Sequence, residues 1–171
     1  MTKTRRFSFS ENQEAREVLL DWWQRLDQAR GDRAELRRAA TPTEVVFGPA
    51  YHHLLYALKR LAPLSPESLA VVAGVLAHVK EHDGRSPFAV QMATPKSGNN
   101  RVPVSDLRFR RLLKIADRSE LYQPLIRTVH LLGGQANLTS LADDIYFWGD
   151  RVRKNWAYAY YEKAPSEDTM D

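Results

Sequence analysis

Helix-start signals recur along this chain, and they restrict its possible folds more than any other feature of the sequence. Thr41-Pro42-Thr43-Glu44 and Ser65-Pro66-Glu67 each combine a side-chain cap, a proline at the first helical position and a glutamate in the first turn. Ser105 and Asn137 are in the same capping position before further amphipathic stretches. Alternating strand patterns are almost missing. We therefore expect an all-α protein.

A polar connection divides the predicted helices into two groups. Glycine, proline and asparagine gather between Asp83 and Pro103, and a loop of that length is usually functional or a linker. We predict two small helical bundles joined by a long polar loop. The expected segments are an N-terminal bundle over residues 1–90, a connecting loop over 91–103, a C-terminal bundle over 104–163 and a flexible tail over 164–171.

Three details of these bundles follow from helical spacing. The helix that Ser65 opens is expected to run to about His82. The last helix is expected to run unbroken from Leu138 to about Glu162, because its apolar residues recur every three or four positions. Trp22 and Trp23 are adjacent, so one ring is expected in the core and the other elsewhere.

Composition excludes several classes of protein. The chain has no cysteine, which excludes disulfides and thiolate metal sites. No apolar run approaches the length of about 18 residues that a membrane-spanning helix needs. The basic residues at the N-terminus are not followed by the apolar stretch of a signal peptide. We expect a cytoplasmic protein without a membrane partner.

Positive charge is concentrated between Arg101 and Arg118. This stretch holds six basic residues against two acidic ones, so it accounts for the whole chain's formal excess of +4. On a helix that starts at Asp106, apolar side chains fall on one side and basic side chains on the other. The basic residues are Arg101, Arg108, Arg110, Arg111, Lys114 and Arg118, with Lys96 in the loop nearby.

Such a one-signed face favours a polyanionic partner, because like charges three or four residues apart on a helix repel one another. Arginine predominates, and its planar fork suits phosphate. Aromatic residues do not interleave with the basic ones, which favours contact with phosphates rather than with bases. Two other interpretations stay open at this stage. The face is solvated, or it docks an acidic protein and the chain is a protein-interaction adaptor.

A third interpretation is a zinc hydrolase. His78-Val79-Lys80-Glu81-His82 matches the short pattern H-x-x-E-H, and histidines four apart on one helix face can hold zinc. The sequence offers no identifiable third ligand, so a polar helix end is the favoured reading. Asp143-Asp144 is interpreted as a pair of acids at a helix start. We expect no catalytic residue, no cofactor and no metal.

Several short motifs, taken in their order along the chain, resemble a known family. They are Leu36-Arg37-Arg38, Pro42-Thr43-Glu44-Val45, Pro49-Ala50-Tyr51-His52-His53, Arg101-Val102-Pro103, Ala116-Asp117-Arg118 and Phe147-Trp148-Gly149 with Arg151-Val152-Arg153. Their sequence of appearance is similar to that of the CasB family, the small subunit of the type I-E CRISPR Cascade surveillance complex.

The resemblance implies a non-catalytic, two-bundle subunit that contacts DNA and CRISPR RNA inside a multi-subunit complex. In that family, two copies line the complex, bridge its other subunits and help to hold the target and displaced DNA strands of the R-loop. The central basic residues named above would inherit nucleic-acid contacts. So would Arg37 and Arg38, and also Arg151 and Arg153 of the last helix. For this last pair, salt bridges with Asp143, Asp144 or Asp150 are the alternative.

Overall fold

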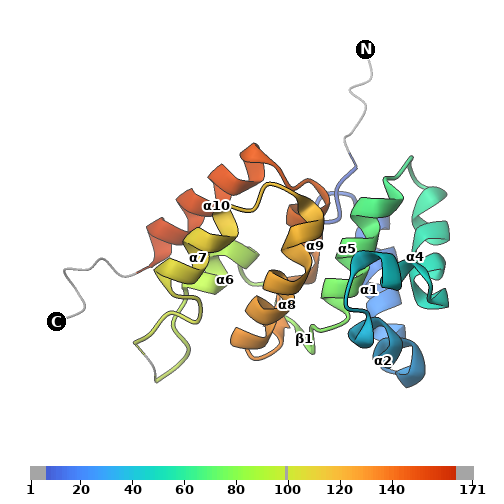
Figure 1. Cartoon of the computed structure of the whole chain (residues 1–171), viewed down its shortest axis with the longest axis horizontal. Helices are drawn as coiled ribbons and strands as arrows, with labels where there is room; N and C mark the ends of the chain where they lie inside the picture. The colour runs from blue at the N-terminus through green and yellow to red at the C-terminus, as the bar shows by residue number, and fades with distance from the viewer. Residues whose placement is uncertain (1–6, 99, 165–171) are drawn as a thin grey trace, which may run out of the picture.

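The computed structural model describes residues 7–98 and 100–164, and in these ranges almost all regular structure is helical (Figure 1). The prediction of an all-α protein is confirmed. The elements are α1 (Gln13–Arg25), α2 (Arg30–Arg38), α3 (Pro42–Val46), α4 (Pro49–Lys59), α5 (Pro66–Leu76), β1 (Glu81–His82), α6 (Phe88–Ala93), α7 (Asp106–Leu113), the 3₁₀ turn η1 (Arg118–Leu121), α8 (Tyr122–Leu131), β2 (Gln135–Ala136), α9 (Leu138–Tyr146) and α10 (Asp150–Lys163).

The predicted helix starts are confirmed by their capping hydrogen bonds. The side chains of Thr41, Ser65, Ser105 and Asn137 each accept a hydrogen bond from the backbone N–H three residues further on. Each therefore satisfies one of the donors that a helix start leaves without a partner. No helix in the described ranges is long and apolar enough to cross a membrane.

The helix that Ser65 opens ends earlier than predicted, at Leu76 rather than near His82. The backbone N–H groups of Lys80 and Glu81 donate to Gly134 O at 2.8 and 3.1 Å. Residues 81–82 then form β1, which pairs in parallel with β2. The expected extension was wrong because this pairing with a distant segment takes up the backbone groups that a helix would use.

The last predicted helix is two helices, α9 and α10, separated at residues 147–149. Arg118 donates hydrogen bonds to two carbonyls at this break, Ile145 O and Trp148 O. The indole of Trp148 donates to Ile115 O at 2.8 Å. The prediction of one unbroken helix was wrong because these contacts come from residues about 30 positions away.

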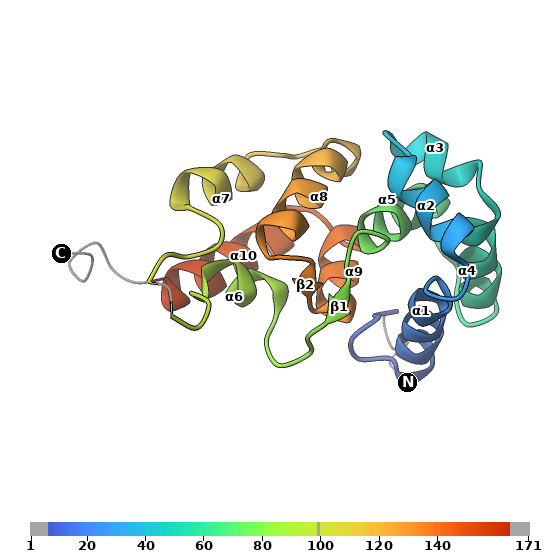
Figure 2. The same cartoon turned by 90° about the horizontal axis from the view of Figure 1, so that it is seen from below.

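The helices on the two sides of the predicted connection share one continuous apolar core. In Figure 2, α5 lies between α2–α4 on one side and α8 and α9 on the other. Trp22 and Trp23 are both buried and donate to Ala50 O and Val79 O, so the expectation that one ring lies outside the core was wrong.

The predicted connection is partly helical. Helix α6 crosses residue 91, the expected start of the loop, and packs against α10 through Phe88 and Trp156, whose ring centroids are 5.8 Å apart. The division into two bundles stays a prediction. The basic N-terminus (residues 1–6) and residues 165–171 of the expected tail lie outside the described residues.

Candidate nucleic-acid interface

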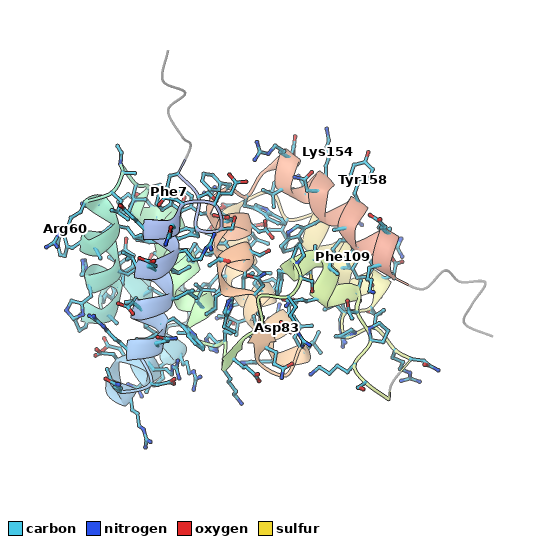
Figure 3. The ribbon with its side chains drawn as sticks, turned by 180° about the vertical axis from the view of Figure 1, so that it is seen from behind. Phe7, Arg60, Asp83, Phe109, Lys154 and Tyr158 are labelled. Atoms are coloured by element: carbon cyan, nitrogen blue, oxygen red, sulfur yellow. The ribbon has the colours of Figure 1, made fainter. Side chains whose placement is uncertain are left out.

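Helix α7 presents its basic face outward because its apolar face is anchored on α10. Phe109 is fully buried and stacks on Tyr160 at 3.9 Å between ring centroids, with the planes 8° apart (Figure 3). The Tyr160 hydroxyl donates to Val104 O at 2.6 Å, which ties α10 to the entry of α7. The basic side chains that remain exposed are Arg108, Arg110, Arg111 and Lys114.

A groove of about 450 Å³ lies between α7 and α8. Helix α7 contributes Arg108 and Arg111 to its lining, and α8 contributes Arg127 and His130. The other lining residues are Leu112, Ile115, Pro124, Thr128 and Leu131. Arg127 and His130 were not among the residues predicted from the sequence. They are three residues apart on the exposed face of α8, a signal that becomes visible only once α8 is known to pack beside α7.

The three arginines of the groove carry charges that no acidic side chain of the described ranges pairs with. Within the described ranges, Arg108, Arg111 and Arg127 are exposed and their guanidinium groups have no ion pair or hydrogen bond. Arg110, by contrast, forms a salt bridge with Asp106 at 3.1 Å. Three cations that converge on one groove without acidic neighbours form a site for an anion.

The start of α8 lies against the segment that follows α2. The hydroxyl of Tyr122 donates to Ala39 O and the amide of Gln123 donates to Ala40 O, both at 2.7 Å. These bonds hold the start of α8 against the segment that follows α2, where Arg38 is exposed. Figure 2 shows α7, α8 and α2 along one side of the molecule.

Three of the predicted basic residues donate hydrogen bonds to backbone carbonyls at helix ends. Arg118 donates to Ile145 O of α9 at 2.8 Å, and Arg153 donates to Leu113 O of α7 at 2.6 Å. Arg37 donates to Ala77 O, at the end of α5, at 2.8 Å. The carbonyls of Leu113 and Ala77 lie at helix ends, where backbone carbonyls lack a partner within the helix.

The remaining predicted residues do not line the groove. Lys96 donates to Leu132 O at 2.9 Å, which holds its loop against the end of α8. Arg101 is exposed before α7, and Arg151 is exposed at the start of α10. For Arg153, the structure shows the salt bridge with Asp150, at 3.2 Å.

The geometry that the zinc-hydrolase interpretation needs is absent. His78 follows the end of α5, whereas Glu81 and His82 belong to β1. Glu81 accepts a hydrogen bond from Gln135, and His82 Nδ1 accepts one from Leu138 N. Among the described residues, no group of three histidine, aspartate or glutamate side chains is placed to hold a metal ion.

His78 instead lies next to His130, one of the residues that line the groove. Its side chain is buried, its Nε2 has no hydrogen-bond partner among the described residues, and its ring lies 5.3 Å from that of His130. Burial lowers the pKa of His78 to about 4, with smaller contributions from His130 and Arg37. The imidazole is therefore neutral at neutral pH and adds no charge to the groove.

Comparison with known proteins gives matches of two kinds. The family model of the CRISPR-associated protein Cse2 matches residues 32–161. The fold is similar to a chain in the crystal structure of E. coli Cascade bound to a PAM-containing double-stranded DNA target, with a TM-score of 0.69 and 21% sequence identity. That alignment covers 85% of this chain and 93% of the other. Curated protein sequences give no significant match.

Proposed function

Because the chain belongs to the CRISPR-associated protein Cse2 family, we propose that it is a non-catalytic subunit of a type I-E Cascade complex that holds nucleic acid by its phosphate backbone. Its nucleic-acid partners are the target and displaced DNA strands of the R-loop and the CRISPR RNA. Its protein partners are the other Cascade subunits and a second copy of itself. It acts in the cytoplasm, where these partners meet.

The observation that carries this proposal is the unpaired charge of Arg108, Arg111 and Arg127 on the two walls of one groove. Like charges held this close raise the free energy of the folded protein unless an anion neutralises them. A phosphodiester backbone supplies one charge per nucleotide, and guanidinium groups bind it bidentately. Contacts of this kind bind without regard to base sequence and weaken with salt.

The test replaces the groove arginines together. The variant Arg108→Ala/Arg111→Ala/Arg127→Ala should bind DNA or RNA oligonucleotides about tenfold or more weakly at low salt. The slope of log K against log salt should become shallower by about two to three, since each lost phosphate contact removes about one. Fluorescence anisotropy titrations of the full chain over a range of salt concentrations measure both quantities.

A charge-matched control separates the groove from bulk electrostatics. Arg25, Arg30 and Arg60 are exposed on other parts of the molecule, so Arg25→Ala/Arg30→Ala/Arg60→Ala changes the net charge equally and should leave most of the affinity. The proposal is wrong if both triple variants lose the same affinity, or if neither does.

Exposed aromatic side chains at the two ends of the molecule support contact with other subunits. Phe47 after α3 and Tyr56 on α4 are 75% and 61% exposed, and Tyr158 on α10 is 77% exposed. Figure 3 shows Tyr158 at the end opposite to Arg60, which follows α4. Aromatic residues are enriched at protein interfaces. If oligonucleotides showed no salt-linked affinity, these surfaces would favour the adaptor interpretation instead.

A further inference from the structure

We infer that the groove between α7 and α8 receives an unstacked nucleobase of a single strand, so that the site binds single-stranded nucleic acid by a base as well as by its phosphates. This inference rests on the proposed function, because it assigns a ligand to the floor of the same groove. The sequence predicted contact with phosphates alone, since no aromatic residue interleaves with the basic residues of α7. The floor of the groove is contributed by both helices and was not visible in that pattern.

The floor is apolar and partly open to solvent. Leu131 is 40% exposed, Ile115 and Pro124 are half-buried, and all three line the groove. Thr128, the hydroxyl-bearing residue of the lining, already donates its hydroxyl to Pro124 O at 2.8 Å. The floor therefore offers apolar contact and little hydrogen bonding, which suits the face of a base better than it suits a phosphate.

The cations of the groove border this floor on both sides. Arg108 and Arg111 come from α7, and Arg127 comes from α8. A nucleotide joins an apolar, flat base to an anionic phosphate, so it complements a floor of leucine and isoleucine between guanidinium groups. Arginine planes also stack on bases. The groove volume of about 450 Å³ lies within the usual range for small-ligand sites, about 300–1,000 Å³.

A duplex cannot use this floor, because its bases are stacked and paired inside the helix. It can meet the arginines only with its backbone. A single strand can turn one base toward Leu131 while its neighbouring phosphates meet Arg108 and Arg127. The groove should therefore distinguish strands with bases from strands that carry the same phosphates without them.

The experiment compares a single-stranded oligothymidylate with an abasic oligonucleotide of the same length at one salt concentration. The full-length chain should bind the abasic strand about five- to tenfold more weakly, the loss expected for removing one stacked base. The variant Leu131→Ala trims the floor at an exposed position and should reduce this ratio to about twofold or less. Leu107→Ala is the matched control, since Leu107 is an exposed leucine of α7, 53% exposed, outside the groove lining.

The outcomes separate this inference from the proposed function. Equal affinity of the parent chain for both strands overturns the inference and leaves the phosphate contacts standing. A ratio that Leu131→Ala does not reduce, or that Leu107→Ala reduces as much, also overturns it, because the base would then lie elsewhere. Failure to bind either strand overturns the proposed function and the inference together.

Discussion

At the residue scale, the neighbouring carboxylates of Asp143 and Asp144 on α9 have different surroundings. Asp143 accepts hydrogen bonds from Phe9 N at 2.6 Å and from the Ser8 hydroxyl at 2.9 Å, so it holds the N-terminal segment against α9. Asp144 is partly buried and accepts a hydrogen bond from Trp156 Nε1 at 2.8 Å. Burial raises the pKa of Asp144 from 3.8 to about 7; the Trp156 bond opposes this shift and the charge of Asp143 adds to it.

The variant Asp144→Asn should therefore change how stability depends on pH. Between about pH 4 and 7, the folded chain holds the Asp144 proton and the unfolded chain does not. Raising the pH through this window thus destabilises the parent, by about 1–3 kcal/mol relative to the variant. Asparagine retains an oxygen that can accept from Trp156.

Urea unfolding at several pH values measures this difference between the parent and Asp144→Asn. The control is Asp21→Asn on the exposed surface of α1, where Asp21 pairs with Arg25. Only a pH dependence larger than that of the Asp21→Asn difference is assigned to Asp144. A difference for Asp144→Asn that is constant from pH 4 to 7 would show that the carboxyl is ionised throughout.

At the scale of elements, α5 joins the helices of the two halves. Every residue from Ser68 to Leu76 is buried. Gly74 lets α5 approach its neighbouring helices closely, because a Cβ at this position would lie 2.7 Å from Tyr122 Oη and 2.8 Å from Val45 Cγ2. The hydroxyl of Tyr122 is held there by its hydrogen bond to Ala39 O. A glycine in the last turn of α5 thus brings this helix against both α3 and α8.

Alanine should have opposite effects at two glycines. Gly74→Ala forces Tyr122 or Val45 to move and should destabilise the fold by about 1–3 kcal/mol. Gly31, in α2, has open space around it. Gly31→Ala should therefore stabilise the folded protein by about 0.5 kcal/mol through helix propensity. Denaturant midpoints at constant m-value measure both. Destabilisation by Gly31→Ala, or tolerance of Gly74→Ala, would contradict this account of the packing.

Local signals explain which elements could be predicted from the sequence. Caps such as Ser65 and Asn137 act within one turn, and the apolar spacing of α7 decides which of its faces is buried, so these features were visible. The end of α5 depends on Gly134, and the break after α9 depends on Arg118. Contacts between distant residues decided these boundaries. The same holds for the site, because one wall of the groove was predictable and the wall formed by α8 was not.

At the scale of the whole molecule, the helices before and after the predicted connection are packed together. Helix α5 packs on α9 and α8, α1 packs on α9, and β1 pairs with β2. Their buried side chains form one cluster. Helices that share one core in this way should lose their structure together.

Tryptophan fluorescence can test this cooperativity, because Trp22 and Trp23 lie before the connection and Trp148 and Trp156 lie after it. Trp22→Phe/Trp23→Phe leaves reporters in the second half, and Trp148→Phe/Trp156→Phe leaves reporters in the first. In each variant, the fluorescence midpoint should coincide with the circular dichroism midpoint of the same variant. Separate midpoints would show that the two halves unfold independently.

The arginines that hold helix ends limit the substitutions that the chain can tolerate as it diverges. Arg118 donates from two nitrogens to two carbonyls, those of Ile145 and Trp148. A lysine ammonium is a single centre and cannot span both. Arg108 and Arg111, by contrast, face solvent, and a lysine there still offers a point charge to phosphate. A lysine on the groove should thus weaken the contacts with a ligand and leave the fold intact, whereas at the break between α9 and α10 it removes a contact within the fold, although all these positions carry the same charge.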